Sequence, residues 1–467
     1  MTSHLSSLPR PWARSLTVLG LAASLSLAAC STTSGSTGGS NGPGPGVALS
    51  STSPAALHAT ITYWSWDGAS YTAAKVAAFN KVYPNIKVDA KSFPSTSAYV
   101  AALGPALASG EGPDVYNLEP GEDITQYGPL SSDLTPLVES ALGADWRSKL
   151  APGAVQELTL DGKLVAAPNG ASGAGTLLVN VGLAQQLGLP LPTASMSLDD
   201  LISYCGKVRA AGKTCISMGA KDEWAAQDVF QAIADSVAPG KYAKAVAGTL
   251  SWADPDLVKA FGIWQGFFDD GVFQKGALGD AEYPTAANVW LKQNALMTPL
   301  GTWEAGEFVA KTNEAAQSAA GVSNPKPMTS VFINFPSVGG HPVSIFASVG
   351  SGSAINAASK NKAAAAAFVA WFSLNPSGGQ RIMADALNGA PTIVGLKPNP
   401  GPFIDPVLQQ PSFDAINTAI SSATEHRAIS YADLVTALGN ALQEAAAGSS
   451  PASVAATLQA ASAKVKR

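Results

Sequence analysis

Two tryptophans and a carboxylate stand close together near residue 65. Trp64, Trp66 and Asp67 lie at or just beyond the end of a β-branched and aromatic run, 60–64, which is typical of a strand. A sugar ring has hydroxyls around its rim and C–H groups on its faces, so it binds where a flat aromatic face adjoins hydrogen-bonding side chains. Trp64 and Trp66 are two positions apart and point to the same side of the strand, so one of them can belong to the core. Trp66 is the favoured site residue because it lies further into the loop.

A second carboxylate, Glu119, follows another predicted strand, 114–118. From there it can accept hydrogen bonds from two adjacent hydroxyls, and each charge-assisted bond contributes about 1.5–3 kcal/mol before desolvation. The alternative role for Glu119 is to cap the turn that follows the strand.

Asp67 and Glu119 also allow a different chemistry, because glycoside hydrolysis uses two carboxyl groups about 5–10 Å apart. However, no predicted strand leads into a Gly-x-Ser-x-Gly elbow, no His-Glu-x-x-His motif occurs, and the four histidines are scattered. We therefore expect no catalytic residue, no metal site and no cofactor. A secreted lipoprotein glycoside hydrolase is the alternative from another class of function.

Strands and helices alternate from residue 59 onward. In order, the predicted elements are a strand at 60–64, a helix at 71–82, a strand at 86–88, a helix at 99–109 and a strand at 114–118. This order predicts an α/β fold with a mostly parallel sheet covered by helices on both faces. Such sheets bind ligands beyond the carboxyl ends of their strands, which is where Trp66 and Glu119 stand.

The first thirty residues indicate export. Arg10 and Arg14 precede an uncharged run, 15–27, that is too short to cross about 30 Å of hydrocarbon. The run ends in Leu-Ala-Ala-Cys, which resembles a bacterial lipobox, so we predict a signal peptide at 1–29 and a lipid on Cys30. An ordinary signal peptide with an incidental Cys30 is the alternative. Residues 30–57 are mostly Ser, Thr, Gly and Pro and predict a flexible linker to the membrane.

The remaining body of about 410 residues is too long for one core and predicts two lobes. A net charge of −5 without a basic run argues against nucleic acid as a partner. Cys205 and Cys215 predict a disulfide, because such a pair in an exported protein is normally oxidised. Two free buried thiols are the alternative.

Six groups of residues keep a common order over about 340 positions. They are 61–66, 79–88, 112–115, 161–168 with 178–180, 301–303 and 355–362. In this order they resemble the family-1 extracellular solute-binding proteins, the relatives of bacterial maltose-binding protein. The resemblance implies a two-lobed type II periplasmic-binding fold, with discontinuous lobes joined by hinge strands and the ligand between them. On this basis lobe one comprises 58–168 and 329–392, and lobe two comprises 169–328 and 393–467.

The resemblance extends the expected site. It gives an aromatic role to Trp303 with Glu304 beside it, a second stacking role to Trp224, and a place at the lobe crossing to Asn169. Two loops, at Gly350 and Asn388, are expected to approach the same cleft. The full expected ligand-binding set is Trp66, Asp67, Glu119, Asn169, Trp224, Trp303, Glu304, Gly350 and Asn388.

What the resemblance implies is a lipid-anchored monomer at the outer face of the cytoplasmic membrane, or in a periplasm. It would capture a small carbohydrate and deliver it to the permease subunits of an ABC importer. A binding protein of the same fold for a polyamine, metal or peptide is the remaining alternative.

Overall fold

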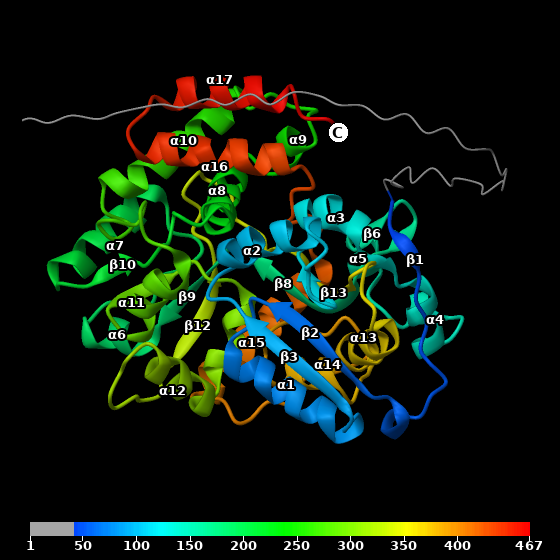
Figure 1. The fold of residues 1–467 in the computed structure, drawn as a ribbon. Helices are drawn as coiled ribbons and strands as arrows, with labels where there is room; N and C mark the ends of the chain where they lie inside the picture. The colour runs from blue at the N-terminus through cyan, green and yellow to red at the C-terminus, as the bar shows by residue number, and fades with distance from the viewer. Residues whose placement is uncertain (1–41) are drawn as a thin grey trace, which may run out of the picture. The chain divides into compact units, whose positions relative to one another are not determined.

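The computed structural model describes residues 42–467, so the predicted signal peptide at 1–29 and Cys30 lie outside it. Across this described range, no helix is both long and apolar enough to cross a membrane. Strands and helices alternate along the chain, which confirms the predicted α/β class (Figure 1).

A five-stranded sheet forms the centre of lobe one. Its order is β3 (Ile86–Ser92), β2 (Ala59–Ser65), β4 (Val115–Leu118), β13 (Phe346–Ile355) and β8 (Ala167–Ala174). β2 is parallel to β3 and β4, and β13 is antiparallel to β4 and β8. The helices of this lobe are α1 (Ala69–Val82), α2 (Thr96–Ala108), α3 (Glu122–Tyr127), α4 (Thr135–Leu142), α5 (Pro152–Glu157), α13 (Lys362–Val369) and α14 (Gly379–Asp385). The predicted β-α-β-α-β run is confirmed.

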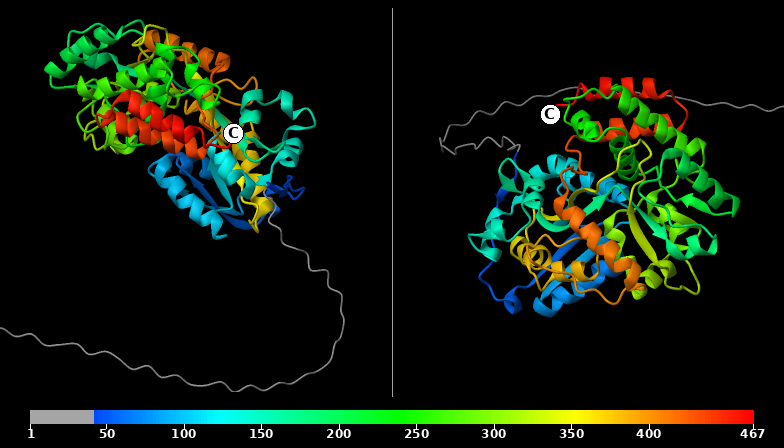
Figure 2. Two further views of the ribbon diagram at one scale, coloured as in Figure 1. Left: turned by 90° about the horizontal axis from the view of Figure 1, so that it is seen from above. Right: turned by 180° about the vertical axis from the view of Figure 1, so that it is seen from behind.

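A four-stranded sheet forms the centre of lobe two. Its order is β10 (Thr214–Ile216), β11 (Ala295–Thr298), β9 (Thr176–Asn180) and β12 (Ser330–Asn334). Its helices are α6 (Val181–Gln186), α7 (Leu198–Ala210), α8 (Glu223–Val237), α9 (Lys241–Val246), α10 (Pro255–Asp269), α11 (Ala287–Leu291), α12 (Ala310–Ala319), α15 (Pro406–Ser422), α16 (Ala432–Ala446) and α17 (Pro451–Ser462). Figure 2 shows the C-terminal helices, in red, beside green helices of this lobe. Both α16 and α17 contact α10, so the end of the chain completes this lobe.

Strand pairing corrects two of the expected lobe crossings. β8 belongs to the first sheet up to Ala174 and β9 to the second from Thr176, so the first crossing is at Gly175 and not at 168–169. Gly175 has a φ of +83°, and a Cβ there would lie 2.8 Å from the Phe346 ring, so this turn requires glycine. β12 pairs with β9, so the second crossing follows β12 and not residue 328. The other lobe boundaries stay a proposal.

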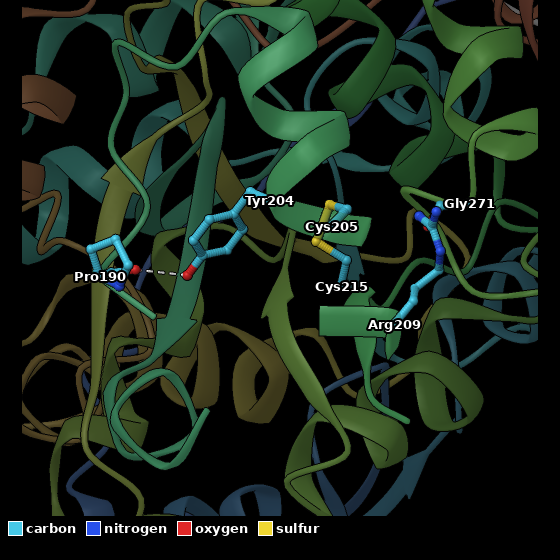
Figure 3. The surroundings of a disulfide bond; sticks show 6 residues. All are labelled: Pro190, Tyr204, Cys205, Arg209, Cys215 and Gly271. Atoms are coloured by element: carbon cyan, nitrogen blue, oxygen red, sulfur yellow. Dashed lines mark hydrogen bonds between the residues drawn. A yellow bond between two sulfur atoms is a disulfide. The ribbon is translucent and has the colours of Figure 1, made fainter. Parts of the chain in front are cut away.

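The predicted disulfide is present and lies within lobe two. It joins Cys205 of α7 to Cys215 of β10, whose Cα atoms are 5.1 Å apart (Figure 3). Around it, the Tyr204 hydroxyl donates to the Pro190 carbonyl at 2.8 Å, and Arg209 Nη1 donates to the Gly271 carbonyl at 2.7 Å. The bond fastens the helix to the edge of the sheet.

The described part of the expected linker, 42–57, packs on lobe one. β1 (Gly44–Gly46) pairs in parallel with β5 (Ser132–Asp133), and Val47 is buried. A Cβ on Gly44 would lie 2.7 Å from the Cβ of Ala357, so this glycine permits close packing. The prediction of a flexible linker over 30–57 is therefore wrong for this stretch, because Gly44 and Gly46 form a strand that packs on the lobe.

Candidate ligand-binding site

Trp66 directly follows β2 at the carboxyl edge of the first sheet. It is half-buried and meets Tyr99 edge-on, with ring centres 5.0 Å apart. The Tyr99 hydroxyl donates to the Asn117 carbonyl of β4 at 2.6 Å. Tyr99 thus fixes the position of Trp66 against the strand that leads to Glu119.

Asp67 has a partner within lobe one. Its Oδ2 atom accepts a hydrogen bond from Lys75 Nζ at 3.2 Å, and Lys75 is only 3% exposed. The ammonium also lies 4.0 and 3.9 Å from the ring centres of Tyr71 and Phe372. Burial lowers the pKa of Lys75, and Asp67 opposes that shift. Asp67 therefore compensates a buried cation through its Oδ2 atom.

Glu119 follows β4, and its backbone N–H donates to Asp123 Oδ2 at 3.0 Å. Asp123 is therefore the residue that caps the turn, and not Glu119. Among residues 42–467 the Glu119 carboxylate has no hydrogen-bond partner. Burial raises the pKa of Glu119, the Arg427 guanidinium lowers it, and Asp228 raises it further. A Cβ on Gly121 would lie 2.6 Å from the Ile429 carbonyl, so the turn after Glu119 packs against the segment that carries Arg427.

Three aromatic side chains of lobe two, Trp224, Tyr283 and Trp303, form what we call the aromatic cluster. Trp224 stacks on Tyr283 with ring centres 6.1 Å apart and meets Trp303 edge-on at 5.9 Å. Trp303 Nε1 donates to the Tyr283 hydroxyl at 2.9 Å, and that hydroxyl donates to Glu304. Two distant segments that the sequence proposes for the site therefore meet, and Tyr283 orients both Trp303 and Glu304.

Arg427 lies over the aromatic cluster. Its guanidinium carbon is 4.9 Å from the Trp303 ring centre and 5.5 Å from that of Trp224. Its Nε atom donates to both carboxylate oxygens of Asp228, at 2.8 and 3.0 Å. The Arg427 and Asp228 side chains are 16% and 8% exposed, so the ion pair is largely removed from water.

The two lobes touch directly around this site. Ser97, at the start of α2, donates to Asp222 Oδ1 at 3.2 Å, and the Gly173 N–H donates to Thr302 Oγ1 at 2.9 Å. A Cβ on Gly301 would lie 2.2 Å from the Trp303 ring and 2.4 Å from the Gly173 carbonyl. Gly301 therefore allows Trp303 to fold back against the hinge strand β8.

Three other expected residues are not gathered into the aromatic cluster. Asn169 is buried and accepts hydrogen bonds from Ser353 and Ser373 at 3.0 and 2.7 Å, while its Nδ2 donates to Ser351 at 3.0 Å. Its polar atoms are thus used within lobe one. Gly350 is in β13, facing Ser172 of β8. Asn388 is exposed in the loop after α14.

Sequence reasoning missed Tyr283, Asp228 and Arg427. Asp228 stands four residues after Trp224 in α8 and so on the same face of that helix, a spacing that the sequence alone could have suggested. Tyr283 and Arg427 lie in irregular segments far from the other site residues in sequence. No local pattern distinguishes them.

Three carboxyl groups, of which two are buried and that of Glu304 is half-buried, lie close to the aromatic cluster. Glu282 is fully buried and accepts from the Gly219 N–H at 2.6 Å, and Glu307 accepts from Trp290 Nε1 at 2.9 Å. Burial raises the pKa of each to about 8, and burial also raises that of Glu304. The region is therefore partly protonated near neutral pH.

This protonation predicts a pH-dependent stability. Glu282 has an ordinary pKa of 4.5 and a folded pKa of about 8, so the folded protein holds a proton that the unfolded chain releases. Stability then falls as pH rises from 4.5 to 8. In Glu282→Gln this fall should shrink by about 1–3 kcal/mol. Urea unfolding at pH 5, 7 and 9 measures it. Glu139→Gln, which changes an exposed carboxylate of α4, should show the same dependence of stability on pH as the unaltered protein. If the free energy of unfolding changed equally with pH in the unaltered protein and in both variants, the assignment to Glu282 would be contradicted.

An α/β fold of two lobes, with an aromatic and charged site where the lobes meet, defines the class of two-lobed binding proteins. The family model of the bacterial extracellular solute-binding proteins matches residues 64–378. This is more than half of the chain, so the protein belongs to that family, and the resemblance seen in the sequence is confirmed.

Individual relatives agree with this assignment. An uncharacterized ABC transporter extracellular-binding protein of Pyrococcus horikoshii is 24% identical over 257 residues, which is 54% of this chain and 57% of that protein. The match thus spans little more than half of that relative's length.

Solved structures share the fold over almost their whole length. A chitin oligosaccharide binding protein is 19% identical with a TM-score of 0.68, covering 87% of this chain and 98% of its own. A maltose-bound protein of T. maritima is 17% identical with a TM-score of 0.68, covering 86% and 98%. A protein of Caldanaerobius polysaccharolyticus described in connection with xylan utilization is 20% identical with a TM-score of 0.67, covering 86% and 99%.

Proposed function

We propose that this protein captures a carbohydrate between its two lobes and delivers it to an ABC importer. The observation that carries the proposal is the juxtaposition of the aromatic cluster with Glu119 of lobe one and Arg427 of lobe two. Aromatic faces suit the C–H faces of a sugar, and a carboxylate and a guanidinium suit its hydroxyls. The chitin oligosaccharide and maltose ligands of proteins with this fold support the same ligand class.

Capture by two lobes gives the function its mechanical basis. A ligand that contacts both Glu119 and the aromatic cluster gains its full set of contacts only when the lobes are closed, so it shifts the population toward closure. An importer can then distinguish the loaded form from the empty one. This function needs no catalytic group, and the pairing of Asp67 with Lys75 argues against Asp67 and Glu119 as a hydrolytic pair.

We further propose that the protein is exported and held at the membrane as a monomer by lipid on Cys30. The run before Cys30 and the Ser-, Thr- and Gly-rich residues after it support this. The site at the lobe interface would then face the extracytoplasmic space.

A thermal-shift screen with neutral oligosaccharides tests the binding proposal. A ligand at about 100 times its Kd stabilises the folded state by about 2.7 kcal/mol, which for a chain of this size raises Tm by roughly 3 °C. We expect at least one neutral sugar to do so, and to be recovered without new reducing ends. Failure of every neutral and acidic oligosaccharide to shift Tm would refute the carbohydrate assignment.

A further inference from the structure

The charges around Arg427 bear on which sugars the site accepts. We propose that Asp228 and Glu119 make the site selective for uncharged sugars, by compensating Arg427 so that it cannot serve as a receptor for a sugar carboxylate. The inference rests on the proposed function and adds the charge class of the ligand.

The charge of Arg427 is compensated by a side chain of the protein itself. Both oxygens of Asp228 lie within 3.0 Å of its Nε atom, and the guanidinium carbon lies 4.9 Å from the Trp303 ring centre and 5.5 Å from that of Trp224. With one carboxylate this close and both side chains largely buried, the positive charge is matched inside the protein. Asp228 thus acts as a positioning residue that holds the guanidinium against the aromatic cluster.

Hydrogen-bonding capacity nevertheless remains at Arg427. Within residues 42–467, only its Nε atom has side-chain hydrogen-bond partners, so the Nη donors are available to a ligand. The Glu119 carboxylate, on the opposite lobe, is an acceptor with no partner in the same range. A sugar hydroxyl can accept from one and donate to the other, so a neutral polyol satisfies both groups without adding charge.

An acidic sugar meets a different balance. Arg427 carries one positive charge, and the carboxylate of Asp228, at 2.8 and 3.0 Å from its Nε atom, already balances that charge. A ligand carboxylate would add a second negative charge beside Asp228, in a site where screening by water is weak, and like charges placed together in an interface disfavour binding strongly. Neutral sugars should therefore bind at least about tenfold more tightly than their uronic acid counterparts.

Matched ligand pairs and charge-neutral variants test this inference. Calorimetry would compare glucose with glucuronate, galactose with galacturonate, and short oligomers of each, on the unaltered protein, Glu119→Gln, Asp228→Asn and the double variant. The double variant should narrow the neutral-to-acidic affinity ratio at least about tenfold, with a gain for acidic sugars that weakens as salt is added. A merely structural role for Asp228 would lower affinity for both ligand classes alike.

The control is Glu139→Gln/Glu444→Gln, which removes two exposed carboxylates away from the site and should leave the ratio unchanged. If Asp228→Asn does not fold by circular dichroism, Glu119→Gln keeps the Arg427–Asp228 pair and should still narrow the ratio. Acidic sugars that bind the unaltered protein as tightly as neutral ones, or a ratio that no variant changes, would overturn the inference alone. Absence of binding to any sugar would overturn the proposed function as well.

Discussion

Replacing Trp303 by alanine should weaken sugar binding by about 30- to 1,000-fold, corresponding to about 2–4 kcal/mol. Trp303 supplies an aromatic face, and its Nε1 atom anchors the Tyr283 hydroxyl. The substitution removes both, and it also takes away the surface on which Arg427 lies. Calorimetry with the neutral oligosaccharide that gives the largest thermal shift measures the loss.

Trp303→Phe is the matched control. It keeps a ring but loses the hydrogen bond to Tyr283, so we expect a loss of about tenfold or less. Far-ultraviolet circular dichroism should be unchanged in both variants, because Trp303 is only half-buried at the edge of the lobe-two core. An affinity for Trp303→Ala equal to that of the unaltered protein would remove this residue from the site.

Replacing Arg427 by methionine should lower the free energy of unfolding by about 3–5 kcal/mol at neutral pH. Methionine retains much of the length but not the charge, so Asp228, 6% exposed, is left without its partner. Burial already raises the pKa of Asp228 in the intact protein, where Arg427 opposes that shift, so loss of Arg427 should raise this pKa further. Urea unfolding measures the loss.

The double variant Arg427→Met/Asp228→Leu distinguishes two causes of the lost stability: an unpaired buried charge on Asp228, and lost packing of the arginine side chain. Removing both charges should recover most of the stability, because the cost of a broken buried pair comes mainly from the partner left behind. The loss in Arg427→Met should also diminish at acidic pH, where the Asp228 carboxylate takes up a proton and no longer leaves a buried charge unpaired. Equal losses in the single and double variants would instead assign the effect to packing of the arginine side chain.

The order of elements in lobe one can be predicted from sequence because the patterns behind it are local. The predicted strands and helices between residues 60 and 118 agree with β2, α1, β3, α2 and β4 to within a few residues. The Cys205–Cys215 bond is equally local, because its two cysteines are ten positions apart in the sequence. Local periodicity does not say which sheet a strand joins, and the lobe boundaries that the family resemblance implies place β12 in lobe one, whereas β12 pairs with β9.

For the site, the sequence by itself determined the chemical types: tryptophans and a carboxylate at Trp66, Trp303 and Glu119, at positions where strands or turns end. Only the tertiary structure decided which charged groups compensate one another. Lys75 donates to Asp67, and Arg427 is paired with Asp228, 199 positions away. The physical reason is that the net charge a ligand meets depends on which other segments place opposite charges beside the site. Such compensation depends on contacts between distant parts of the chain, which no local pattern specifies.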